Sequence, residues 1–218
     1  RKETFVFIGF LLFLNISNFN YSSNLPLYYV FFVLPIICLI WEPVVFFFPF
    51  IASILVIRLR YNQATTLLSK ITICFIPALI VAMIIATNPI TPENHLIMES
   101  SLKENFGEDC YMACGMLLSR SSIISQFVQN FESVTFDGLI RYPLIILIGF
   151  APIFLLSFNS KLKKEILFFK HFKNLLHPIL LLLTPAFFLF TMMGDWGRIV
   201  NISYTFTALF YFYLLQNN

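Results

Sequence analysis

Long apolar blocks alternate with short polar connections along the chain. The first block, Thr4 to Leu14, has only about half of the ~20 residues that a membrane-spanning helix needs. It follows Arg1 rather than a start methionine, and it lacks the small-residue cleavage site of a signal peptide. We therefore expect the end of a helix here and the C-terminal part of a longer protein. Asn15 to Asn24 is then predicted to be a polar, uncharged loop.

The next apolar stretch runs from Leu25 to Ile57 and is interrupted by a Trp-Glu-Pro triplet at 41–43. One straight helix of about 33 residues would be ~50 Å long, well beyond a hydrocarbon core of ~30 Å. We therefore expect a turn at Glu42 between two short helices, Pro26–Ile40 and Val44–Ile57. A single broken helix is the alternative.

Four later blocks are predicted to span: Ile71–Thr87, Tyr142–Ser157, Leu175–Met193 and Ile199–Leu215. The polar segment 88–138 between the first two carries seven acidic residues, opposed only by Lys103 and Arg120. The segments 58–70 and 159–174 are instead basic. Because positively charged loops stay in the cytoplasm, the segment 88–138 and the connection at 194–198 are expected on the outer face.

This pattern predicts an all-α, polytopic transmembrane helical bundle of about six spans, with residues 1–218 forming one transmembrane domain. Its outer-face loop, 88–138, is expected to contain short amphipathic helices, since Gly115 to Phe131 has apolar residues at helical spacing. Composition agrees: 59% of residues are hydrophobic and 11% charged, against about 25% charged in soluble domains.

The sequence has neither of two common nucleotide-binding motifs, the Walker loop and the dinucleotide fingerprint. It also lacks two common hydrolase motifs, the nucleophile elbow and the zinc-protease helix. The basic residues lie beside apolar blocks, which fits control of topology better than nucleic-acid binding. We expect membrane lipid as a partner, no nucleic acid, and no cofactor.

The strongest candidate for a functional site is the Gly-Asp-Trp-Gly-Arg connection at 194–198. In a structural interpretation the glycines make a turn, Trp196 anchors at the membrane interface, and Asp195 pairs with Arg198. In a functional interpretation, charges so close to hydrocarbon mark a site, and Arg198 grips a phosphate or diphosphate with its planar fork. Both interpretations stay open.

Two further charged residues are expected at the same level of the bilayer. Arg141 begins the span that leaves the outer loop, and Glu42 lies at the predicted turn. In the functional hypothesis Arg141, Arg198 and Trp196 bind a diphosphate substrate, and Asp195 or Glu42 acts as general base for an acceptor hydroxyl. A snorkelling arginine and a solvated turn residue are the alternatives for Arg141 and Glu42.

The Asp-Trp-Gly-Arg turn at 195–198, between two late spans and after a long outer loop, resembles the bacterial surface-polysaccharide polymerases of the O-antigen polymerase and EpsG-like group. The resemblance implies a cell-envelope glycosyltransferase of polysaccharide biosynthesis in the bacterial inner membrane. Such an enzyme acts at the outer face on a polyprenyl-diphosphate-linked glycan, and the resemblance assigns its outer-face acid and arginine to Asp195 and Arg198.

Two hypotheses from other classes remain beside the enzyme. A transporter or flippase half would use helices broken at prolines such as Pro35, Pro77 and Pro185. A non-catalytic subunit would dock a protein partner through the outer loop.

The four cysteines fall into two pairs. Cys38 and Cys74 lie inside apolar blocks and are expected to be buried, inert thiols. Cys110 and Cys114 lie in the outer segment, where an oxidising compartment favours a disulfide, although free thiols stay open. A metal site is disfavoured because only His95 lies nearby and a structural zinc needs four ligands.

Overall fold

The structure is a computed structural model, and it describes residues 2–19, 24–58, 64–88, 90–110, 127–128, 131–132, 135–160, 172, 174–192 and 196–217. The regular elements in these ranges are helices: α1 (Lys2–Phe19), α2 (Leu25–Ile40), the 3-10 helix η1 (Glu42–Phe47), α3 (Phe48–Arg58), α4 (Ala64–Thr87), α5 (Pro92–Phe106), α8 (Phe136–Asn159), α9 (Leu176–Met192) and α10 (Trp196–Asn217).

Three of these helices are long and apolar enough to cross a membrane, over Leu68–Thr87 in α4, Ile140–Asn159 in α8 and Trp196–Gln216 in α10. The apolar helices α2 and α9 are shorter. The expectation of an all-helical membrane protein is therefore confirmed for the described residues, while the number of six spans stays a prediction.

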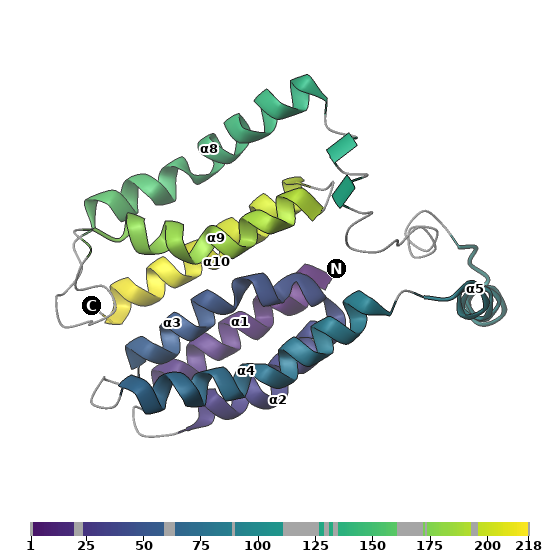
Figure 1. Cartoon of the computed structure of the whole chain (residues 1–218), viewed down its shortest axis with the longest axis horizontal. Helices are drawn as coiled ribbons and strands as arrows, with labels where there is room; N and C mark the ends of the chain where they lie inside the picture. The colour runs from purple at the N-terminus through teal and green to yellow at the C-terminus, as the bar shows by residue number, and fades with distance from the viewer. Residues whose placement is uncertain are drawn as a thin grey trace.

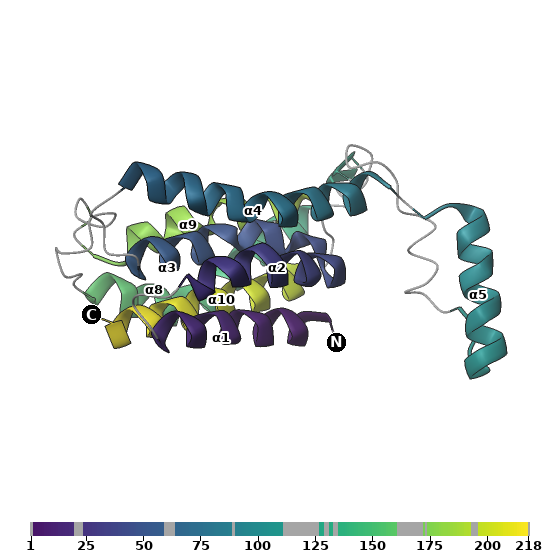
Figure 2. The same cartoon turned by 90° about the horizontal axis from the view of Figure 1, so that it is seen from below.

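All the described helices except α5 lie side by side in one bundle (Figures 1 and 2). The helices α1 and α10 both begin at one end of this bundle, which we call the Trp41 end because α2 also finishes there. At the opposite end, which we call the Arg58 end, α3 finishes and the C-terminus of the chain lies. The helix α5 lies apart, beyond the Trp41 end.

The basic and acidic connections leave from opposite ends of the bundle. The helix ends that flank the basic segments 58–70 and 159–174 lie at the Arg58 end, whereas α4 finishes and α8 begins at the Trp41 end, on either side of the acidic segment. This is the alternation that the charge pattern predicts. Which end faces the cytoplasm stays a prediction.

The predicted break in the second apolar stretch is confirmed, since α2 stops at Ile40 and a 3-10 turn starts at Glu42. Two predicted loops are wrong in part. The helix α1 continues to Phe19, and near its end the Asn18 amide lies 3.5 Å from the Gln216 side-chain oxygen of α10. The helix α4 begins at Ala64, inside the segment expected to be a loop.

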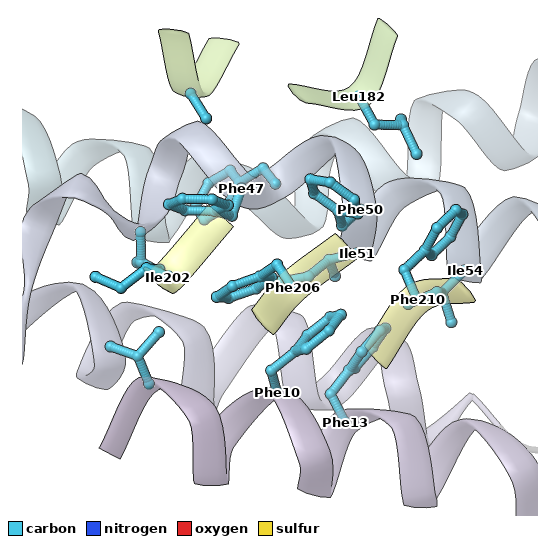
Figure 3. Packing of buried hydrophobic residues seen from close by; sticks show 14 of the residues in the cluster. Phe10, Phe13, Phe47, Phe50, Ile51, Ile54, Leu182, Ile202, Phe206 and Phe210 are labelled. Atoms are coloured by element: carbon cyan, nitrogen blue, oxygen red, sulfur yellow. The ribbon is translucent and has the colours of Figure 1, made fainter. Parts of the chain in front are cut away.

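Stacked phenylalanines form the centre of the bundle (Figure 3). The ring of Phe206 in α10 lies 4.4 Å from that of Phe10 in α1 and 4.5 Å from that of Phe47 in η1, measured between centroids. Phe50 and Phe210 meet edge to face at 5.5 Å. All five side chains are almost fully buried, so the core joins helices from the first quarter of the chain to its last helix.

The helices α1 and α2 approach each other closely at Gly9. The Tyr29 hydroxyl donates a buried hydrogen bond of 2.7 Å to the Gly9 carbonyl oxygen. A Cβ atom at Gly9 would lie 2.5 Å from Cδ1 of Ile37. A small residue is therefore required for this packing, as at many interfaces between membrane helices.

The helix α5 shows that the acidic segment does contain a short helix, with caps at both ends. The Thr91 hydroxyl accepts from the Asn94 amide at 3.3 Å, Pro92 is the first helical residue, and Gly107 ends the helix with φ of 66°. The amphipathic helix predicted at 115–131 falls largely outside the described residues.

Candidate functional site

Trp196 holds three helices together at the Trp41 end. Its ring lies 4.7 Å from that of Tyr142 in α8 and 5.4 Å from that of Phe190 in α9, between centroids. The side chain is half-buried and packs on the core. Trp196, Gly197 and Arg198 form the first turn of α10, so the prediction of a turn at 194–198 is wrong for these three residues, and Gly194 and Asp195 lie outside the described residues.

Arg198 forms an ion pair with α1. Its Nε lies 3.1 Å from Oε1 of Glu3, and the two side chains are 48% and 17% exposed respectively. An arginine in the first turn of a helix faces the positive end of the helix dipole, which is unfavourable, and a carboxylate beside it offsets this effect. The sequence hypothesis paired Arg198 with Asp195, which lies outside the described residues, and it did not include Glu3.

Glu3 did carry a signal in the sequence. It is an acid at the edge of an apolar block, the same feature that drew attention to Glu42. What the sequence does not contain is the packing of α1 on α10, which brings Glu3 to Arg198.

The structure places the other candidate residues at the same end of the bundle. Arg141 is an exposed residue of α8 and directly precedes Tyr142, the residue that contacts Trp196. Glu42 is the half-buried first residue of η1, which packs against α2, α4 and α9. The arginines Arg141 and Arg198 therefore lie on two helices that meet at one aromatic contact, within two residues of its rings, and their role in binding stays a prediction.

The outer-segment cysteine Cys110 is disulfide-bonded, and its expected partner Cys114 lies outside the described residues. The Cys110 sulfur also lies 3.6 Å from Nε2 of His95, which is buried on α5. Cys38 and Cys74 are free thiols, the first buried and the second half-buried. Among the described residues, no group of three or more histidines, cysteines and acids is arranged to hold a metal ion.

No protein-family profile, curated protein or solved structure matches this chain. Its chemistry has to be inferred from its own residues.

Proposed function

We propose that this chain is a membrane-embedded enzyme of surface-glycan assembly that binds a polyprenyl-diphosphate-linked sugar at the Trp41 end. The observation that supports this most is that two exposed arginines, Arg141 on α8 and Arg198 on α10, lie one and two residues along their helices from the rings of the Tyr142–Trp196 contact. A planar guanidinium group binds phosphate oxygens in pairs. A diphosphate presents such oxygens on two neighbouring groups, and its lipid tail would lie along the apolar helices.

In the proposed reaction the arginines and Trp196 hold the substrate, and Asp195 or Glu42 accepts a proton from the acceptor hydroxyl. The hydroxyl oxygen bonds to the anomeric carbon of the sugar as the bond from that carbon to the diphosphate oxygen breaks. The polyprenyl diphosphate leaves with the electron pair. Arginines near the leaving group stabilise the negative charge that develops there.

The prolines that suggested a transporter do not break their helices, so they give that hypothesis little support. The helices α4 and α9 continue through Pro77 and Pro185, and α2 continues through Pro35. Transporter sites of the broken-helix type form where such helices unwind. The break that the described residues do contain, at Trp41, separates two helices of the N-terminal half.

A binding experiment tests the proposal. The whole protein is placed in lipid nanodiscs and titrated with a radiolabelled polyprenyl diphosphate, with the corresponding polyprenol and inorganic diphosphate as separate arms. Losing one charged hydrogen-bond donor typically costs a factor of about 10 or more in affinity, so Arg141→Gln and Arg198→Gln are each expected to weaken binding by about that factor.

Lys103→Gln is the matched control, because Lys103 is exposed on α5, away from the bundle, and pairs with Asp109 at 3.3 Å. It should leave the affinity unchanged. Equal binding by the wild type and both arginine variants would refute the proposal, and equal affinity for inorganic diphosphate would show that the lipid is not recognised.

A further inference from the structure

The ion pair between Glu3 and Arg198 is asymmetric in a way that bears on how the arginine is presented. The Glu3 side chain is 17% exposed, whereas that of Arg198 is 48% exposed. The carboxylate side chain is therefore less accessible than the arginine side chain to an anion in solution.

The contact is made at one defined edge of the guanidinium group. Glu3 Oε1 lies 3.1 Å from Nε, and the five N–H donors of arginine lie in a single plane. A partner at Nε therefore fixes the orientation of that plane. An arginine side chain has several rotatable bonds, and ordering it before binding lowers the entropy lost when a ligand binds.

The carboxylate itself is held by the packing of α1. Glu3 lies on α1, three residues before Val6. Val6, Phe10 and Phe13 then bury the same helix in the core. Glu3 thus has a rigid support, and a rigid neighbour is what a preorganised binding group needs.

From these observations we propose that Glu3 is a positioning residue for Arg198, holding its guanidinium plane in the orientation that receives a phosphate group of the substrate. This inference rests on the proposed function and names a residue that the sequence hypothesis lacked. Glu3 does not contact the substrate, and it takes no part in proton transfer.

The test compares two substitutions of Glu3 in the same nanodisc titration with a polyprenyl diphosphate. Glu3→Gln keeps an oxygen that accepts from Nε, so its affinity should stay within about 2-fold of the wild type. Glu3→Ala removes the acceptor and should weaken binding by about 3- to 10-fold, the effect of leaving one long side chain unordered.

A double variant separates a role of the ion pair in binding from simple stabilisation of the bundle. Glu3→Arg combined with Arg198→Glu can re-form the ion pair between α1 and α10, and it should restore the melting temperature that either single variant loses. It should not restore binding, because the exposed partner is then an acid. If the ion pair only stabilised the bundle, the double variant would recover both the melting temperature and the binding affinity.

The outcomes also distinguish this inference from the proposed function. If Glu3→Ala binds as tightly as the wild type, or more tightly, while Arg198→Gln binds weakly, Glu3 does not position the arginine and the proposed function stands. If Arg198→Gln binds like the wild type, the positioning role of Glu3 is overturned, and if Arg141→Gln does so as well, the proposed function is overturned with it.

Discussion

The helices α8 and α10 have similar lengths and lie in the same bundle, but they are used differently. Half of the spanning stretch of α10 is buried inside the bundle, against 17% of that of α8. Yet α10 is the less apolar of the two. In a water-soluble protein the more apolar helix would be expected in the interior. In a bilayer the lipid solvates apolar side chains, so close packing and not hydrophobicity decides which helix is buried in the bundle.

Residues on the two helices illustrate this difference. In α10, Phe206 and Phe210 are fully buried among other rings. In α8, Leu147 and Ile148 are about two-thirds exposed, at 64% and 65%. The strongly apolar sequence of α8 thus reflects contact with lipid, and the mixed sequence of α10 reflects contact with protein.

The sharpest test of this comparison is truncation of one large side chain on each helix. Phe206→Ala removes a ring that stacks on Phe10 and Phe47, and it should lower the free energy of unfolding by roughly 3 kcal/mol. Leu147→Ala should change it by about 0.5 kcal/mol or less, because lipid replaces the lost contacts. Reversible unfolding in mixed detergent micelles measures both. Similar losses for the two variants would mean that α8 is as much a core helix as α10.

Replacing glycines by alanine should give the next largest changes in the free energy of unfolding. Gly9→Ala places a methyl group 2.5 Å from Ile37 Cδ1 and 3.3 Å from the Tyr29 hydroxyl oxygen. The overpacking costs roughly 1–2 kcal/mol, and the better helix propensity of alanine offsets about 0.5 kcal/mol of it. Gly149→Ala, between α8 and α10, meets Val200 at an ordinary 3.7 Å. Since alanine is the better helix former, that variant should gain about 0.5 kcal/mol. The same unfolding assay measures both variants. A lower free energy of unfolding for Gly149→Ala would show that α8 packs more tightly than its exposure indicates.

The smallest changes in the free energy of unfolding are expected when two buried serines are replaced by alanine. The Ser157 hydroxyl in α8 donates to the Ile153 carbonyl oxygen at 2.6 Å, whereas the buried Ser203 hydroxyl in α10 has no hydrogen-bond partner among the residues that the structure describes. Ser157→Ala should therefore destabilise by about 1 kcal/mol, and Ser203→Ala should be neutral or slightly stabilising. If Ser203→Ala instead lowers the unfolding free energy by as much as Ser157→Ala, its hydroxyl has a partner in the membrane-embedded protein.

The sequence allowed the coarse fold to be predicted because apolar block lengths are tied to bilayer thickness. The break at Trp41 followed from that argument, since an unbroken helix would have been too long. The boundaries of α5 were also readable, from Thr91 with Pro92 at its start and Gly107 at its end, but the search for an apolar stripe led to 115–131 instead.

The candidate site was predicted less well, for a physical reason. Residues 196–198 look like a turn because of the glycines on either side of Trp196, yet contacts of that ring with Tyr142 and Phe190 make them helical. The partner Glu3 comes from the far end of the sequence. Both facts depend on which helices are neighbours, and helix periodicity in a uniformly apolar chain carries little of that information.

The pairing of α1 with α10 has a consequence for biogenesis. The two helices run in the same direction, with Glu3 beside Arg198 at one end and Asn18 beside Gln216 at the other. Synthesis proceeds from the N-terminus, so α1 is made before the helix that supplies Phe206 exists. Until then α1 packs on α2 and α3 without the stacking of Phe10 on Phe206, and a ribosome stalled before α10 should leave α1 more easily extracted than it is from the complete chain.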